Sequence, residues 1–332
     1  MSDMPQQAVS LRRLFSPIRG AALAVSLVAV FLILSRLDRA ALHIAFKQLK
    51  PMWFLVAAGA FALSLSLGAW RWHQMLRITG VAVDLPTSWR LTVVGHTFCA
   101  LLFGAAVSDV AKATLYSRWF GFPLSRILAA SALDRSAGAV STILYGLITL
   151  GIALWAGPPL HWAQLHWTLS WPWVVITGLV AAVIGFGLYF LRRRWVRYWD
   201  RFVLELGKAL SELRARPALT LSAVVAGLLV QVLVSTVLGC CLCAIHPGPL
   251  PWMQLLWTFP VIGVAASMPV TLSGAGARDG AAILLWATFG ISSAMAFSAC
   301  LLTLCVNLGW AFVGIGFAWH GFRQKSSASE QP

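Results

Sequence analysis

The chain of 332 residues is 59% hydrophobic and 11% charged, and it contains 17 tryptophans. This composition is far too apolar for a soluble domain with an ordinary surface, so it predicts an integral membrane protein. The net charge of +15 belongs to no basic soluble module, which argues against a nucleic-acid partner and favours anionic lipid.

The apolar segments predict helices, because the alternating ten-residue segments of a membrane barrel are not found. A helical crossing takes roughly 20 apolar residues, and the run 280–290 reaches about half that length. Not every apolar run can therefore cross. The runs, in chain order, are 20–37, 51–70, 91–108, 127–156, 171–191, 218–245, 252–271, 280–290 and 293–319.

Basic residues in the short loops predict the orientation, because such loops stay in the cytoplasm. The loop 192–217 carries the strongest basic block, and residues 71–90 contain three arginines, so both are expected to be cytoplasmic. Residues 157–170 and 246–251 contain no charged side chain and are expected outside. The block from Arg192 to Arg201, interleaved with aromatic residues, is typical of an interfacial helix on an anionic leaflet.

The parity of the crossings requires two segments to turn back within the membrane. An odd number of crossings must connect cytoplasmic 71–90 to external 157–170, so 91–126 is predicted to be a re-entrant hairpin. The same argument makes 252–290 a hairpin that enters from outside. The expected fold is all-α, a polytopic membrane protein with about six full transmembrane helices and two re-entrant helical hairpins.

The two halves have the same order of elements and start from opposite faces, which predicts an inverted repeat. Phe120-Gly121 and Phe289-Gly290 each precede a long helix. Inverted repeats with broken helices place a binding site near the midplane, as in transporters. The expected regions are a cytoplasmic segment 1–19, a first repeat 20–156, an external loop 157–170, a second repeat 171–319 containing the cytoplasmic loop 192–217, and a cytoplasmic tail 320–332.

The stretch Pro-Val-Thr-Leu-Ser-Gly-Ala-Gly-Ala-Arg-Asp-Gly, residues 269–280, interrupts the second half with two glycines and two charges. Irregular backbone at membrane depth is tolerated only where it lines a cavity or is buried in protein. A helix expected from residue 280 would direct its free N–H groups to the same place, which suits an anion such as a phosphate. A tight hairpin with Arg278 paired to a nearby acid is the alternative.

Three aspartates are expected at membrane depth, and each has a basic residue close in sequence. Asp109 and Lys112, at i and i+3, can face each other, whereas adjacent residues such as Asp134 and Arg135 point apart. A pair between the halves, such as Asp109 with Arg278, is expected, and mutual neutralisation without a ligand is the alternative. With Arg118 and Arg126 included, the basic residues near the hairpin tips exceed the aspartates by two, which favours an anionic headgroup.

These arguments predict a substrate-binding site without a catalytic residue, metal or cofactor. Cys240 and Cys243 have C-x-x-C spacing but no second ligand pair, and the chain has no G-x-x-x-x-G-K-[ST] phosphate loop. The predicted site residues are Asp109, Lys112, Arg118, Asp134, Arg135, Ser273, Gly274, Gly276, Arg278 and Asp279.

The same residues resemble a family, the lysylphosphatidylglycerol synthase transmembrane region or flippase-like domain of bacterial membrane proteins. Its Pro-x-Ser-x-Gly-Gly-x-Gly-x-Arg-Glu pattern is similar to Pro269–Asp279, with Thr271, Ser273 and Asp279 as substitutions. Its Pro-Gly-x-x-Gly-Asp pattern, followed by a basic residue and an Asp-Arg helix, is similar to Gly104–Asp109, Lys112 and Asp134-Arg135. Here the proline is absent and Ser108 replaces the last glycine.

The resemblance implies a bacterial inner-membrane protein with both termini in the cytoplasm that flips a lipid with an anionic or zwitterionic headgroup. The chain stops at Pro332 and leaves no room for the aminoacyl transferase domain of some relatives, so enzymatic activity is not expected. A membrane enzyme acting on lipid headgroups or lipid-linked sugars is one rival, and a non-transporting scaffold of a lipid-modifying complex is another. A lipid-modifying partner enzyme and a homo-oligomer are open alternatives.

Overall fold

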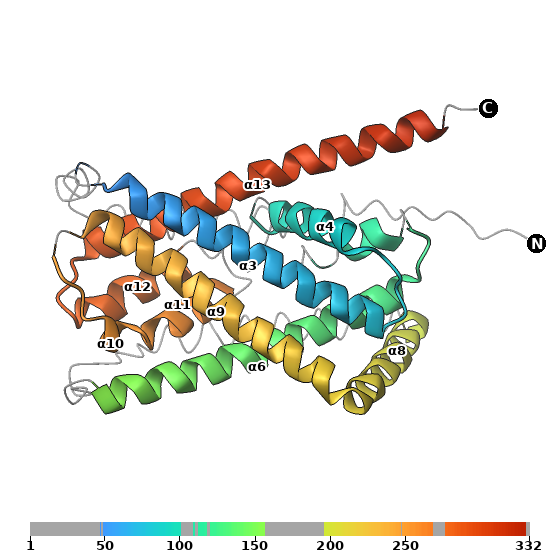
Figure 1. Cartoon of the computed structure of the whole chain (residues 1–332), viewed down its shortest axis with the longest axis horizontal. Coiled ribbons are helices and arrows are strands. Elements are labelled where there is room, and N and C mark those ends of the chain that lie inside the picture. The colour runs from blue at the N-terminus through green and yellow to red at the C-terminus, as the bar shows by residue number, and fades with distance from the viewer. Residues whose placement is uncertain are drawn as a thin grey trace, which may run out of the picture.

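The computed structural model describes residues 47, 49–100, 109, 112–117, 120–156, 196–246, 248–267 and 276–329. Every regular element in these residues is a helix, so the all-α prediction is confirmed for them. Figure 1 shows the helices α3 (Pro51–Ile78), α4 (Leu85–Phe98), α6 (Leu124–Ala156), α8 (Val196–Ala215), α9 (Pro217–Ile245), α10 (Trp252–Leu255), α11 (Thr258–Ser267), α12 (Ala277–Ala287) and α13 (Ser293–Ser329).

Four of these helices are long and apolar enough to cross a membrane. They contain the candidate spans Pro51–Ile78, Leu124–Trp155, Pro217–Ile245 and Ser293–Phe317. The predicted runs 51–70, 127–156, 218–245 and 293–319 coincide with these four helices, so the chain is a multi-pass membrane protein. The other two predicted crossings, 20–37 and 171–191, lie outside the described residues.

The remaining apolar helices are too short to cross. α4 has 14 residues, α11 has 10 and α12 has 11, which at about 1.5 Å per residue is well below the thickness of the hydrocarbon. The predicted limb 252–271 is broken between α10 and α11. Pro260, in the first turn of α11, has no N–H to continue the ladder from α10, which explains the break.

Two helix boundaries differ from the prediction in ways that matter for the site. α3 continues past the apolar run to Ile78, so Arg71 lies two turns inside a helix and not in the predicted loop 71–90. α12 begins at Ala277, so Arg278 and Asp279 lie in its first turn and not before it. A long arginine stem covers apolar surface while its head finds a partner, so a charge does not have to end a membrane helix.

The antiparallel helices α3 and α9 form the centre of the bundle, with α6 and α13 each packing against both (Figure 1). Lys50, just before α3, donates its backbone N–H to the carbonyl of Ala244 near the end of α9 at 2.8 Å. α8, the loop after α3 and the C-terminal part of α13 lie at one end of the bundle in Figure 1. α10 and the C-terminal ends of α6 and α9 lie at the other end.

The long helices α6 and α13 begin with the same local backbone. Gly121 has φ +72° and Gly290 has φ +76°, and each lies three residues before its helix, which begins at Leu124 or Ser293. Glycine adopts positive φ without the steric cost that a Cβ imposes. The glycines of the two Phe-Gly pairs therefore share the same left-handed φ as well as the same position before a long helix.

Candidate functional site

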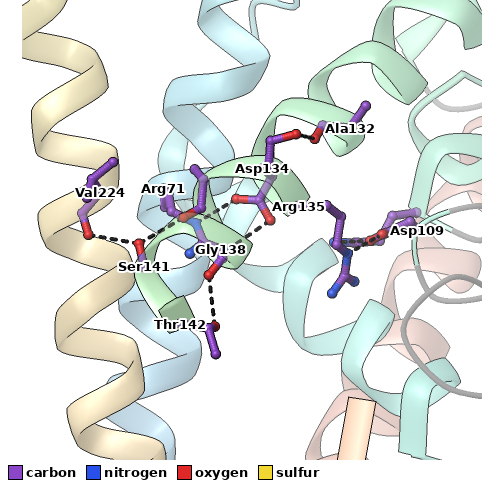
Figure 2. A network of polar contacts seen from close by, with 12 residues as sticks. Arg71, Asp109, Ala132, Asp134, Arg135, Gly138, Ser141, Thr142 and Val224 are labelled. Atoms are coloured by element: carbon purple, nitrogen blue, oxygen red, sulfur yellow. Dashed lines mark hydrogen bonds and ion pairs between the residues drawn. The ribbon is translucent and has the colours of Figure 1, made fainter. Parts of the chain in front are cut away.

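An ion pair connects two spanning helices inside the bundle. Arg71 of α3 reaches Asp134 of α6 through two bonds, 2.7 Å from Nε to Oδ1 and 3.1 Å from Nη2 to Oδ2 (Figure 2). The two side chains are 12% and 13% exposed. Ser141, about two turns after Asp134 in α6, donates its hydroxyl to the carbonyl of Val224 in α9. The polar contacts therefore tie α3, α6 and α9 together.

A second cluster surrounds Asp109. Its carboxylate lies 3.1 Å from Nζ of Lys112 and 2.6 Å from Nε of Arg135. Lys112 also lies over the ring of Trp72, 4.5 Å from its centroid, and the indole N–H of Trp72 donates to the hydroxyl of Tyr116. A buried ammonium is thus stabilised by a carboxylate on one side and an aromatic face on another.

The third charge pair lies at the start of α12. The carboxylate of Asp279 accepts from Nε and Nη2 of Arg278, both at 3.0 Å, and from the backbone N–H of Gly276 at 3.0 Å. Nη2 of Arg278 also donates to the carbonyl of Cys300 in α13 at 2.9 Å. Both charged side chains are buried, and Gly276 has φ +94°. The first turn of α12 is therefore fixed to α13 by its own charges.

A cavity of about 390 Å³ lies inside the bundle between α3, α4, α9, α11, α12 and α13. Its walls combine apolar side chains such as Phe61 and Ile262 with polar ones from all six of these helices. Cys99, which lines it just after α4, lies within electrostatic range of the Asp109 cluster. The principal polar residues are Ser64, Thr92, His96, Gln231, Arg278 and Asn307.

The structure describes seven of the ten predicted site residues, and it brings only Arg278 to the cavity wall. The interaction predicted for Asp109 and Lys112 is present. Asp134 and Arg135 do find their partners elsewhere, in Arg71 and Asp109. Arg118, Ser273 and Gly274 lie outside the described residues.

Two predictions about the charges are wrong. Asp109 and Arg278 do not pair across the halves, because Lys112 and Arg135 surround Asp109 while Asp279 and a carbonyl of α13 hold Arg278. Adjacent residues can share a bond after all, since Arg278 bends along the first turn of α12 to reach Asp279.

The sequence-based charge count also changes in the structure. Arg126 belongs with Glu205 of α8, 3.6 Å away, so it does not contribute to the interior. Arg71, which the prediction did not count, lies inside the bundle and forms an ion pair with Asp134. Among the described residues of the three clusters, four cations (Arg71, Lys112, Arg135, Arg278) face three aspartates, and Arg118 of the predicted count lies outside the described residues.

Several polar residues of the site were not predicted from the sequence. Gln231 and Asn307 lie within two of the candidate membrane spans, and a polar side chain within such a span is itself a functional signal that could have found them. His96 of α4 was also missed, because this segment was interpreted only as one limb of a hairpin. Arg71 was assigned to a loop by its charge.

The model of the family described as lysylphosphatidylglycerol synthase TM region matches residues 20–316. The match covers most of the 332 residues, so the chain belongs to this family. A comparison with curated proteins gives no significant match. The matched region contains all three charge clusters and the cavity.

Proposed function

We propose that this member of the lysylphosphatidylglycerol synthase TM region family translocates a phospholipid or another polar lipid between the leaflets of a bacterial inner membrane. The observation that carries the proposal is the cavity of about 390 Å³ between spanning and non-spanning helices, whose largely apolar walls also present polar side chains. A headgroup that crosses the bilayer must leave water, and unpaired polar groups are costly in hydrocarbon. A cavity with hydrogen-bonding walls lowers that cost.

The packing of the helices supports an inverted repeat of six crossings and two re-entrant hairpins. Exchanging α3 with α9, α6 with α13 and α4 with α11 maps the contacts among these six helices onto one another. The contact of α3 with α6 then corresponds to that of α9 with α13, and the contact of α4 with α13 to that of α11 with α6. The matching backbone at Gly121 and Gly290 follows the same exchange.

The positions of the short helices support entry of the two hairpins from opposite faces. α4 begins at the end of the bundle that carries α8, whereas α10 begins at the opposite end (Figure 1). Since α8 is basic and strongly amphipathic, we place its end of the bundle in the cytoplasm. The C-terminal part of α13 lies at that same end.

A second candidate function is a scaffold that binds a lipid-modifying enzyme without transporting lipid. The observation that favours it is that Arg71 with Asp134, and Arg278 with Asp279, already satisfy one another. Buried ion pairs of this kind can serve structure alone. The two functions differ in whether filling the cavity matters.

Cavity-filling variants of two glycines test the proposal. Gly68 and Gly263 line the cavity, and a Cβ built on either meets no atom within 4 Å. Gly68→Leu and Gly263→Leu should therefore fold and fill the cavity. Gly59→Leu is the matched control, because Gly59 lies on the same helix as Gly68, is exposed on the outside of the bundle and also has free space.

The measurement is the rate at which a fluorescent phospholipid in proteoliposomes becomes accessible to an impermeant quencher. We expect both cavity variants to lower the protein-dependent rate at least about 10-fold at equal folded protein, which corresponds to about 1.4 kcal/mol of barrier. Arg278→Ala and Asp109→Asn are expected to lower it too. Wild-type protein that moves no lipid, or cavity variants as active as Gly59→Leu, would favour the scaffold.

A further inference from the structure

The helix α8 presents a different kind of side chain on each of three neighbouring faces. Leu206, Ala209 and Leu213 share the first face, because positions three and four apart lie on one side of a helix. Ala209 is buried in the hydrophobic cluster that contains Ile127 and Leu133 of α6, and the two leucines pack against this cluster. The first face therefore holds α8 on the bundle.

The second face is charged and reaches the beginning of α6. The carboxylate of Glu205 lies 3.6 Å from Nε of Arg126 and 3.6 Å from Nζ of Lys208. Arg126 belongs to the first turn of α6, which starts at Leu124, and α8 lies at that end of the bundle. The charged face therefore points outward, beyond the end of the bundle.

The third face is apolar and uncovered. Val203, Leu210 and Arg214 share it, at spacings of seven and four residues. Val203 is 48% exposed, Leu210 is 46% exposed, and Arg214 is exposed as well. At about 100° per residue, these three side chains lie on the opposite flank of the Leu206 face from Glu205. The bundle thus covers only part of the apolar surface of α8.

The position of the charged face fixes the direction of the apolar one. Figure 1 shows α8 running across the long axis of the bundle, so one flank of the helix faces out of the end and the other faces back along the bundle. The contact of Glu205 with Arg126 assigns the outward flank to the charges. Val203 and Leu210 therefore face back along α6, which is one of the candidate spans. At this level a spanning helix passes from the hydrocarbon into the headgroups.

We propose that α8 is a membrane-interface helix that binds the phospholipid leaflet at its end of the bundle. Val203 and Leu210 lie among the acyl chains, Arg214 extends to the lipid phosphates, and the face of Glu205 stays in water. Helices of this kind bury their apolar face about 5–10 Å into the boundary between headgroups and acyl chains. A long arginine side chain reaches the phosphates while its stem stays on apolar surface.

This lipid surface is separate from the cavity and does not depend on lipid translocation. It follows the basic block Arg192–Arg201 along the chain, which adds attraction to an anionic leaflet. A protein partner from the cytosol would approach α8 from the end of the bundle, where it meets the charged face. The direction of the apolar face therefore favours lipid over a protein as its partner.

Spin labels on single cysteines test the proposal in the full chain, with the native cysteines replaced and the protein in vesicles of phosphatidylcholine and phosphatidylserine. The labelled variants are Val203→Cys and Leu210→Cys, and Lys208→Cys is the matched control on the charged face of the same helix. The measurement is the ratio of collision rates with oxygen, which concentrates in hydrocarbon, and with a neutral nickel chelate, which stays in water. We expect this ratio to be at least about fivefold higher at positions 203 and 210 than at 208. Equal ratios at the three positions, as a solvent-exposed or protein-covered face would give, would overturn the proposal.

A charge reversal tests the role of Arg214. Arg214→Glu places a carboxylate next to the lipid phosphates, so it should lower the collision ratio at Leu210→Cys by at least about twofold. Lys208→Glu makes the same change of charge on the face in water and should leave that ratio unchanged. An equal effect of the two reversals would refute the contact of Arg214 with the phosphates. Neither readout involves lipid movement, so both results are independent of the proposed function.

Discussion

Arg71 on α3 and Asp134 on α6 form a two-point ion pair whose side chains are almost completely withdrawn from solvent. The pair lies where α3 and α6 meet α9, next to the bond from Ser141 to Val224 (Figure 2). Such a buried pair adds little net stability to a fold. Removing one partner is strongly destabilising, because the remaining charge stays buried.

This asymmetry predicts the behaviour of single and double variants. Asp134→Leu should lower the free energy of unfolding by about 3–5 kcal/mol, because it leaves the guanidinium of Arg71 unpaired. The double variant Arg71→Leu with Asp134→Leu should recover most of that loss. Unfolding of the detergent-solubilised proteins, followed by tryptophan fluorescence, measures both values. A double variant as unstable as Asp134→Leu would show that the charge itself is not the cause.

The contact between α4 and α13 depends on the absence of a side chain at Gly314. A Cβ at this position would lie 2.6 Å from the backbone oxygen of Val93 and would overlap the hydroxyl of Thr97. Gly314→Ala should therefore lower the free energy of unfolding by about 1–3 kcal/mol, as overpacking does. Gly309→Ala on the same helix, where a Cβ meets nothing within 4 Å, should be neutral. Equal thermal stability of the two variants would argue against this packing of α4.

The first turn of α12 depends on glycine at position 276. Its φ of +94° is costly for a residue with a Cβ, and its N–H bonds the carboxylate of Asp279. We expect Gly276→Ala to cost about 1–3 kcal/mol of stability. Gly280→Ala, one turn later in α12 with free space around its Cβ, should have no cost or a small gain from helix propensity. Thermal unfolding of the two alanine variants side by side makes the comparison, and a stable Gly276→Ala would contradict it.

Asp84 caps α4 and gives a prediction about pH. Its carboxylate accepts the backbone N–H of Thr87 at 3.1 Å, and this hydrogen bonding holds the pKa of Asp84 below its ordinary value. The stabilisation is therefore complete above the unfolded pKa of about 3.9 and is lost as the pH falls through the lower folded pKa. Since Asp84 is exposed, the pH-dependent part should be only a few tenths of a kcal/mol.

Two variants separate the cap from the charge. Asp84→Ala should cost about 1 kcal/mol near neutral pH, because no side chain then accepts from the first turn of α4. Asp84→Asn should keep most of the cap and lose the dependence on pH between about 5 and 3. Unfolding free energies measured over this range test both statements. A wild type and an Asn variant with the same pH profile would show that the bond to Thr87 does not depend on charge.

Hydropathy predicted the four described spans because each apolar run is long enough to determine its own helix. Length also excluded 280–290 as a crossing, whereas the prediction that 91–126 turns back came from the parity of the basic and uncharged loops. The helix ends were less predictable: α3 runs to Ile78 because Arg71 finds Asp134 inside the bundle, a long-range contact that no local pattern contains.

The charged residues of the three clusters could be found in the sequence, with the exception of Arg71, but most of their pairings could not. Asp109 and Lys112 pair as helical spacing requires, whereas the bond between Arg278 and Asp279 depends on a side-chain conformation that spacing does not give. The cavity wall needed the fold, because His96, Gln231 and Asn307 come from three helices far apart in the sequence. A glutamine or asparagine in an apolar span was the available signal.

The central claim is that water reaches a hollow at mid-depth between helices that cross the bilayer. It can be tested with two cysteines placed on α3 in a background whose six native cysteines are replaced. Gly68→Cys lines the cavity, and Gly59→Cys is exposed on the outside of the bundle, where lipid would cover it. Both positions have free space for a side chain. A thiol must ionise in water to react with a charged methanethiosulfonate reagent.

The decisive measurement is the rate at which this reagent modifies the two cysteines in intact proteoliposomes. We predict that Gly68→Cys reacts at least about 10-fold faster than Gly59→Cys, because only the cavity gives the thiolate a hydrated environment. Equal rates at the two positions would contradict a hydrated cavity and the transport proposal that depends on it.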